Sequence, residues 1–302
     1  MAVRSRSVIG LILAAAAWGI GTVISKRAVD EVPPLTLIAI QLSASVLLLA
    51  LLMRSRGIPL RGDHPALLGR LGILNPGIAY ALSLVGLVTV SASLSVLLWA
   101  LEPLLILGLA ALVLRERVTA SLVLASVGAA AGAVLVIGQP EGGQLVGVVL
   151  TIAGVVCCAV YTIICRRFIA ASDGTAPVVL AQQVHALVFM FLVVGALAIT
   201  GSDVGLASIT PIGLASAVTS GVLYYAAAYW FYLSALRDVP ASIASTAFYL
   251  IPVFGLAGAN VLLGERLEPQ QWLGAALILA AILTILRRQV ATTDATRLVA
   301  ST

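Results

Sequence analysis

Two ionisable residues, Glu102 and His185, lie deep inside long apolar stretches of this sequence. An ionisable side chain at the centre of a membrane costs about 2.5–3.5 kcal/mol for Asp, Lys or Arg, so we interpret such residues first as functional. Glu102 shares a helical spacing with Ser95 and Trp99 and directly precedes Pro103. Three roles stay open for it: binding an ammonium group, carrying a proton, or bracing a neighbouring helix.

Uncharged polar groups accompany these two residues. His185 is a single imidazole, which suits packing, a ligand contact or a proton relay. Because neither a second His nor a carboxylate lies close to it in the sequence, we expect no metal site. Gln41, Gln182 and Gln183 can both donate and accept hydrogen bonds. They suit recognition of a carboxylate or an amide, and they suit interhelical hydrogen bonds equally well.

Aromatic residues gather in the stretch YYAAAYWFYL, residues 224–233. Within it, Tyr225, Tyr229 and Tyr232 follow the i, i+4, i+7 spacing and form one face of a helix. We predict that this stripe walls a cavity for a ligand with an apolar or aromatic group. Packing or an interfacial aromatic belt is the alternative. The other aromatic residues expected around the cavity are Tyr80, Trp99, Tyr224, Phe248 and Tyr249.

Long apolar elements must hold these side chains, and the composition supplies them. Of 302 residues, 61% are hydrophobic and 10% charged, against about 25% charged in a soluble domain. About 20 apolar residues span a membrane as a helix, and the alternation of a barrel strand is missing. We therefore predict an all-α membrane protein. The ten predicted transmembrane helices are 7–28, 33–53, 67–87, 91–114, 119–138, 144–166, 177–199, 210–235, 240–264 and 269–287.

The basic residues indicate topology rather than nucleic-acid binding, although the net charge is +5. If the N-terminus is cytoplasmic, all of the 17 basic residues except Lys26, Arg27 and Arg266 fall on the cytoplasmic side. This bias is what the positive-inside rule describes. We therefore predict that both termini are cytoplasmic and expect no nucleic-acid partner.

The chain contains an internal repeat. The stretch VSASLSVLLWALEPLLILGLAALVLRERV, from Val90, aligns without a gap with VPASIASTAFYLIPVFGLAGANVLLGERL, from Val239. The offset is 149, and it also aligns Tyr80 with Tyr229.

Weaker matches place Lys26-Arg27 on Arg166-Arg167 at an offset of 140 and Gln41 on Gln183 at an offset of 142. Each copy holds five predicted helices, so the second copy must enter the membrane from the opposite side. Inverted repeats of this kind are common in secondary transporters, where the substrate site lies between the halves. We predict a first five-helix repeat over 1–138, a second over 139–289, and a short cytoplasmic tail over 290–302.

Prolines and paired charges mark the places where these helices break or end. We expect Pro76, Pro103 and Pro252 to kink or unwind their helices. The pairs Glu116-Arg117 and Glu265-Arg266 occupy corresponding positions in the two copies. We interpret them as gate or cap ion pairs at the two faces of the membrane.

Two copies of Pro-x12-Glu-Arg, starting at Pro103 and Pro252, follow the small-residue stretches SASLS and PASIAS. This doubled motif resembles the EamA-type branch of the drug/metabolite transporter superfamily, over about residues 10–287. The resemblance implies ten helices in inverted five-helix repeats, cytoplasmic termini and movement of small metabolites, often outward. Gln41 departs from the pattern, since relatives often carry Arg in the second helix.

Missing motifs narrow the function further. No GxxxxGK[ST] loop is present, so we expect no ATP and no other cofactor. Neither HExxH nor a pair of intramembrane aspartates is present, so we expect no enzyme. The prediction is a secondary transporter of the inner (plasma) membrane that exports apolar and aromatic amino acids. Its partners are a small-molecule substrate and the lipid bilayer, with proton coupling as an option. Export of purines, nucleotide precursors or drugs, a membrane-embedded enzyme and an interaction protein are the alternatives.

Overall fold

The computed structural model describes residues 5–62, 66–113, 144–168, 175–201, 204–205, 209–236, 250–277 and 279–280, and short pieces at 124, 127–128, 131–132 and 135. Within these residues the chain forms helices joined by turns, and it forms no strand. The predicted all-α class is confirmed for this part of the chain.

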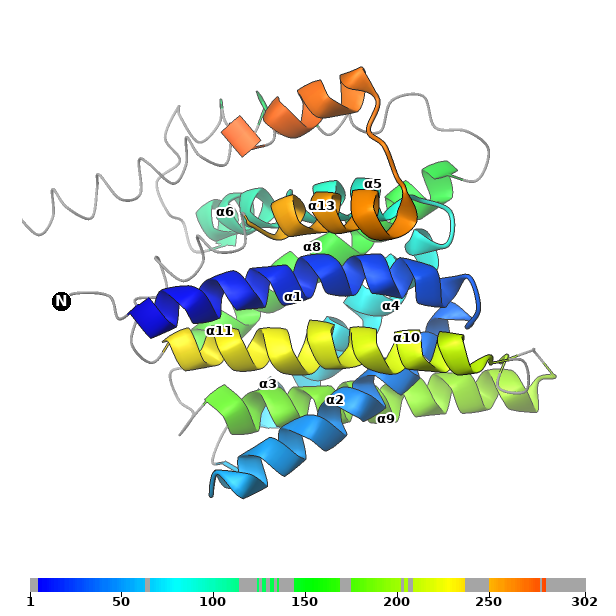
Figure 1. The fold of residues 1–302 in the computed structure, drawn as a ribbon. Coiled ribbons are helices and arrows are strands. Elements are labelled where there is room, and N and C mark those ends of the chain that lie inside the picture. The colour runs from blue at the N-terminus through cyan, green and yellow to red at the C-terminus, as the bar shows by residue number, and fades with distance from the viewer. Residues whose placement is uncertain are drawn as a thin grey trace, which may run out of the picture.

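The described helices form two groups along the chain (Figure 1). The first group is α1 (Ser5–Val29), α2 (Pro34–Ser55), α3 (Ala66–Gly72), the π-helical segment η1 (Ile73–Ile78), α4 (Ala79–Leu87), α5 (Ala92–Trp99) and α6 (Glu102–Val113). The second group is α8 (Gln144–Phe168), α9 (Thr175–Ile199), α10 (Pro211–Gly221), the π-helical segment η3 (Val222–Ala227), α11 (Ala228–Leu236) and α13 (Ile251–Leu263).

Within the described residues, six helical stretches, one of them kinked at Asn75, are long and apolar enough to cross a membrane. They are Ile9–Val29, Pro34–Ser55, Ala66–Leu87, Gln144–Cys165, Ala176–Ile199 and Pro211–Tyr232, and the shorter apolar helix Ile251–Leu263 adds to them. Each coincides with a helix predicted from the sequence. Most of 119–138, residues 240–249 and the end of 269–287 lie outside the described residues, so the count of ten stays a prediction.

The predicted helix 91–114 is interrupted just before Pro103, one of the prolines expected to kink or unwind its helix. The chain makes a turn at Ala100 and Leu101 between α5 and α6. Pro103, the second residue of α6, has no N–H to donate to the carbonyl of Trp99. The Leu101 N–H instead bonds to the Leu98 carbonyl at 3.1 Å, one residue closer than an α-helix requires. The helical spacing assumed between Trp99 and Glu102 therefore does not hold.

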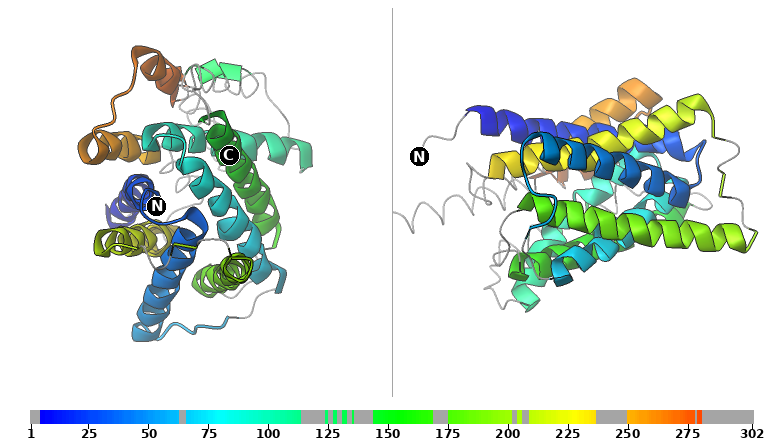
Figure 2. Two further views of the ribbon diagram at one scale, coloured as in Figure 1. Left: turned by 90° about the vertical axis from the view of Figure 1, so that its right-hand side faces the viewer. Right: turned by 90° about the horizontal axis from the view of Figure 1, so that it is seen from below.

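The described helices form one bundle in which α1 occupies a central place. It contacts α13 on one side and α10 and α11 on the other. In the end-on view of Figure 2, α1, α9 and the α10–η3–α11 helix point toward the viewer, and α2 crosses between them at an angle. The buried core gathers around Leu37, Leu42 and Leu97, each with an exposed fraction of 0%.

Large apolar side chains also cover the outside of the bundle. Leu47, Leu192 and Ile199 are 62%, 68% and 90% exposed. In water such a surface would be unfavourable, but lipid tails are as apolar as leucine. The exposed faces thus fit a bilayer, and the helices hold together by close packing between them.

The repeat reappears in the bounds of the elements. At the offset of 149, η1 (Ile73–Ile78) falls on η3 (Val222–Ala227), and α4 (Ala79–Leu87) falls on α11 (Ala228–Leu236). The first residue of α6, Glu102, falls on Ile251, the first residue of α13. The two stretches therefore share their departures from regular α-helix, although most of their side chains differ.

Candidate functional site

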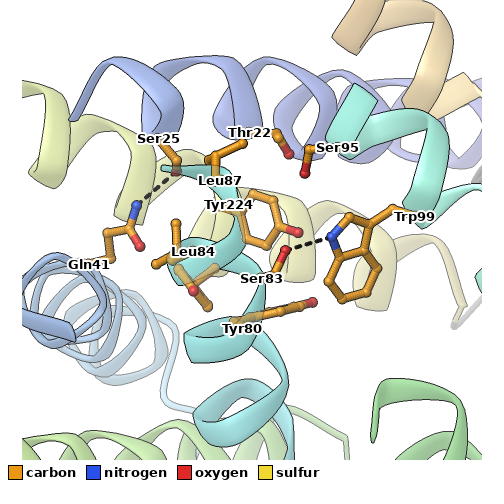
Figure 3. Close-up of a pocket in the computed structure, with 11 residues that line it drawn as sticks. Thr22, Ser25, Gln41, Tyr80, Ser83, Leu84, Leu87, Ser95, Trp99 and Tyr224 are labelled. Atoms are coloured by element: carbon orange, nitrogen blue, oxygen red, sulfur yellow. Dashed lines mark hydrogen bonds between the residues drawn. The ribbon is translucent and has the colours of Figure 1, made fainter. Parts of the chain in front are cut away.

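A small cavity lies in the interior of the bundle, between α1, α2, α4, α5 and η3 (Figure 3). Its volume is about 20 Å³, which is room for about one water molecule. Among the described residues that line it, none is charged. The lining residues are Thr22, Ser25, Gln41, Tyr80, Ser83, Leu84, Leu87, Ser95, Trp99, Tyr224 and Tyr225.

Aromatic rings form one wall of the cavity, and Tyr80 of α4 is their common partner. Its ring lies edge-on to Trp99, Tyr224 and Tyr225, with centroid distances of 5.4, 5.2 and 5.5 Å. Edge-to-face pairs at such distances are favourable beyond the area that they bury. The wall joins residues of α4, α5 and η3, elements from both copies of the repeat.

The indole of Trp99 is held in place by a hydrogen bond. Its Nε1–H donates to Ser83 Oγ at 2.9 Å, across the cavity from α5 to α4 (Figure 3). An indole N–H is a donor that needs a partner when it is buried. Ser83 thereby orients the ring that closes this end of the cavity.

Gln41 forms the polar wall from α2. Its Nε2 donates to Ser25 Oγ at 2.9 Å and to Ser220 Oγ at 2.7 Å, which joins α2 to α1 and α10. Its Oε1 is buried and has no hydrogen-bond partner among the described residues. The cavity thus offers one unused acceptor next to an aromatic wall.

Glu102 lies beside this cavity but does not line it. Its Oε1 accepts a hydrogen bond from the Cys158 thiol of α8 at 3.1 Å, and its side chain is half-buried. A thiol is a weak donor. The structure therefore places the acid at the contact between α6 and α8, three residues after Trp99.

Two further polar residues expected at the site lie outside the cavity lining. Gln183 is satisfied by the protein, since its Oε1 accepts from Ser45 Oγ at 2.6 Å and its Nε2 donates to the Tyr225 carbonyl at 3.5 Å. His185 Nδ1 lies 2.7 Å from the carbonyl of Ala181 on its own helix. Both residues belong to the packing of α9.

The predicted tyrosine stripe divides between two environments. Tyr225 faces Tyr80 at the cavity. Tyr229 and Tyr232 pack edge-on against Trp18 of α1, with centroid distances of 5.6 and 5.8 Å. The π-helical turn of η3 rotates Tyr224 into the cavity beside Tyr225, so the two neighbours both reach it.

Glu265 is used as a helix cap. Its two carboxylate oxygens accept hydrogen bonds from the N–H groups of Ala92 and Ser93, both at 2.8 Å. A carboxylate suits the positive end of a helix dipole. The residue that follows α13 thus holds the first turn of α5, while Arg266 is exposed.

Lys26 of α1 holds the end of α4, just before the turn that leads from α4 to α5. Lys26 Nζ donates to the carbonyls of Leu87 and Val88 at 2.8 and 3.2 Å. These carbonyls end α4, where a helix dipole is negative. Together Lys26 and Glu265 attach this turn to α1 and to the end of α13.

The prolines lie at breaks or starts of helices. Pro76 lies in η1, after a cis Asn75–Pro76 peptide bond, and Asn75 has non-helical backbone angles. Pro252 is at the beginning of α13, as Pro103 is in α6. Four predicted site residues lie outside the described residues: Phe248, Tyr249, Glu116 and Arg117.

Sequence reasoning missed the part of the lining that α1 contributes. Thr22 and Ser25 are three residues apart, which places both on one face of the helix. That spacing was the available signal, but small hydroxyl residues are common at helix contacts in membranes. Within the described residues no group of three His, Cys, Asp or Glu side chains could hold a metal ion.

Comparison with known proteins identifies relatives along nearly the whole chain. The model of the EamA-like transporter family matches residues 5–138 and 145–287. An uncharacterized transporter of Archaeoglobus fulgidus is 26% identical over 278 residues, which cover 90% of this chain and 95% of that protein. The uncharacterized transporter YyaM of Bacillus subtilis is 30% identical over 215 residues, covering 68% of this chain and 67% of that protein. A crystal structure shares the fold with a TM-score of 0.67 at 20% identity, and covers 95% of this chain and 99% of its own.

Proposed function

Because the chain belongs to the EamA-like transporter family, we propose that it exports apolar and aromatic amino acids from the cytoplasm by alternating access. Membership makes it a multi-pass transporter of the inner (plasma) membrane, with small molecules as substrates and lipid as surroundings. The amino-acid substrate and the direction are our proposal.

The observation that carries the proposal is the aromatic wall of an uncharged interior cavity. Tyr80, Trp99 and Tyr224 present ring edges and faces to it, and Gln41 adds a polar wall opposite. Ligand sites commonly combine such apolar walls with a few polar groups that orient the ligand. A side chain such as that of phenylalanine or leucine suits this surface.

The cavity must widen before it can hold an amino acid. A volume of about 20 Å³ accommodates about one water molecule. We propose that the two repeats, 1–138 and 139–289, rock against each other around it, as inverted repeats do. The corresponding bounds of η1–α4 and η3–α11 support this arrangement. So does the Glu265 cap, which ties the end of one repeat to α5 of the other.

We assign proton coupling to Glu102. It is an acid at membrane depth whose Oε1 is bonded to the Cys158 thiol. Intramembrane carboxyl groups commonly act in proton relays. Its place beside Trp99 rather than in the lining suits a group that exchanges a proton when the cavity opens.

The test is flux from proteoliposomes loaded with labelled phenylalanine, leucine or lysine, with and without a pH gradient. We expect efflux of phenylalanine and leucine, acceleration by the gradient, and little lysine efflux. Glu102→Gln keeps an oxygen that can accept from Cys158, so it should preserve the fold but remove the response to the gradient. A difference of one pH unit is worth about 1.4 kcal/mol for each proton moved, so such a gradient should accelerate efflux by up to about tenfold.

Glu268→Gln is the matched control, because Glu268 is exposed and lies away from the cavity. Folded wild-type protein that moves no amino acid would contradict the substrate assignment and direct the search to nucleobases and drugs. A gradient response that survives Glu102→Gln would contradict the proton role alone.

A further inference from the structure

The amide of Gln41 has a definite orientation. The Ser220 hydroxyl donates its proton to the carbonyl of Ala217 at 3.1 Å, so its oxygen is left to accept from Gln41 Nε2 at 2.7 Å. The second amide hydrogen goes to Ser25 Oγ at 2.9 Å. Both donors of Gln41 are therefore used, and the amide cannot also donate to a carboxylate in the cavity.

What Gln41 still offers is an acceptor. Its side chain is 1% exposed, it lines the cavity, and its Oε1 has no partner among the described residues. Buried carbonyl oxygens are normally hydrogen-bonded, because an unsatisfied one loses its water without replacement. Because Gln41 lines the cavity, a molecule bound there as the cavity widens can supply the donor that this buried oxygen lacks.

Gln182 of α9 occupies the corresponding place in the second repeat. A Cβ on Gly221 would lie 2.6 Å from the backbone carbonyl oxygen of Gln41. A Cβ on Gly72 would lie 1.9 Å from the backbone carbonyl oxygen of Gln182. Gly72 and Gly221 are related by the offset of 149. These contacts pair Gln41 with Gln182, an offset of 141, and not with Gln183 as the sequence comparison suggested.

The nitrogen partners of the two amides correspond only in part, because Gln182 Nε2 donates to the Leu68 carbonyl at 3.0 Å whereas Gln41 Nε2 donates to Ser220 Oγ. Gln41 Nε2 donates to Ser25, and Gln182 Nε2 contacts Cys165 Sγ at 4.0 Å, the residue at the offset of 140. The oxygens differ. Gln182 Oε1 accepts a hydrogen bond from the Tyr161 hydroxyl at 2.8 Å.

The same offset of 140 carries Tyr161 onto Gly21, which has no side chain to donate. The second repeat thus contains a phenol O–H on its buried glutamine oxygen. In the first repeat the place beside the glycine is taken by Tyr224, whose Cδ2 lies 3.1 Å from where a Cβ on Gly21 would be, and no described residue donates to Gln41 Oε1. The second repeat thus shows that a hydroxyl donor can satisfy the oxygen that the first repeat leaves without a partner.

We propose that Gln41 Oε1 binds the hydrogen-bond donor of the transported molecule, which for an amino acid is its ammonium group. The inference rests on the proposed function and deepens it. The cavity selects molecules that combine an apolar or aromatic group with an N–H or O–H donor, and it does not require their carboxylate. The rings of Tyr80 and Tyr224 add to the selection, because aromatic faces attract cations.

The experiment compares three labelled probes in proteoliposomes: L-phenylalanine, phenethylamine and 3-phenylpropanoate. The first two carry the ammonium group, and the third carries only the carboxylate. We expect wild-type protein to move both ammonium probes at least about tenfold faster than 3-phenylpropanoate, since a site built to bond a donor rejects an analogue without it.

Gln41→Met keeps the side-chain volume but removes the acceptor. In this variant the ratio of the phenylalanine rate to the 3-phenylpropanoate rate should fall to about one. Gln41→Glu keeps an acceptor and should retain the preference. Gln182→Met is the matched control, because it removes an equally buried amide that does not line the cavity. It should leave the preference unchanged even where it lowers stability.

The outcomes separate the two proposals. If none of the three probes moves, the proposed function is overturned and this inference with it. If the probes move but wild-type protein transports 3-phenylpropanoate as fast as phenylalanine, only the inference about Gln41 is overturned. That result needs measurements on the wild-type protein alone. A preference that survives in folded Gln41→Met protein also overturns the inference alone.

Discussion

The start of α6 and the start of α13 occupy corresponding positions in the two repeats, yet one carries an acidic side chain and the other an apolar one. In the first, Glu102 accepts a hydrogen bond from Cys158 of α8. In the second, Ile251 packs against the apolar cluster that contains Trp18 of α1. Ile251 lies at the offset of 149 from Glu102, and Cys158 at the offset of 140 from Trp18.

The backbone framework is shared, and the polar chemistry is not. Helix bounds and glycine contacts recur between the repeats. The bond between an acid and a thiol, and the amide oxygen without a described partner, occur at one of the two corresponding places and not at the other among the described residues. The difference teaches that the fold is set by the symmetric part of the sequence, and the candidate function by the places where symmetry fails.

The largest expected effect comes from breaking the shared framework. Gly72→Ala would place a Cβ 1.9 Å from the backbone carbonyl oxygen of Gln182, so α3 and α9 must separate. We expect the free energy of unfolding in detergent to fall by about 3 kcal/mol or more, at the upper end for overpacking. Gly221→Ala, with its nearest contact at 2.5 Å, should lose somewhat less.

Gly108→Ala is the control for helix propensity, because nothing lies within 4 Å of its added Cβ. Chemical denaturation should show its stability unchanged or slightly raised. Equal stability of all three variants would contradict the view that these glycines set the helix contacts.

An intermediate effect is expected when the polar chemistry is copied into the apolar half. Ile251→Glu puts a carboxyl group against the Trp18 cluster, where no thiol stands at the corresponding place. Burying a polar group without a partner costs about 1–3 kcal/mol in mutational data, and we expect about 2 kcal/mol. Ile251→Leu, which keeps the apolar volume, should stay near wild type in the same denaturation measurement. A tolerated glutamate would mean that the two sites differ less than their side chains suggest.

The smallest effect is expected from removing the thiol. Cys158→Ala deletes the donor to Glu102, and since a thiol is a weak donor the loss should be below about 1 kcal/mol. Cys158→Ser restores a donor and should recover it. Cys157→Ala, at the neighbouring half-buried position, serves as the reference. A loss of stability well above the expected value would show that this bond is a main support of α6.

Much of the fold could be predicted from the sequence. In a bilayer an apolar stretch of sufficient length has to form a helix, because only a helix satisfies its own backbone groups. The stretches around Ile38, Val155 and Val188 therefore left no alternative, and the structure has helices there. The break before Glu102 was also within reach, since Pro103 removes a specific backbone donor.

The site was predicted less completely. Tyr80, Trp99 and Gln41 meet at one cavity as expected, whereas Tyr229 and Tyr232 pack against Trp18. Helical spacing states which residues share a face, but the π-helical segment η3 and the kink at Asn75 in η1 shift that face within a helix. This rotation of the helix face is visible only in the backbone geometry.

By itself the sequence determined the class of protein, the places of its helices and the existence of the repeat, because these follow from local hydrophobicity and from comparing the chain with itself. Only the tertiary structure decided that Gln182 Oε1 has a tyrosine hydroxyl as its partner while Gln41 Oε1 has none among the described residues. The physical reason is that the hydrogen-bond partner of a buried polar atom comes from a neighbouring helix. Which side chain that helix offers depends on how far it is shifted along its axis and rotated about it. Spacing within one helix does not contain that information.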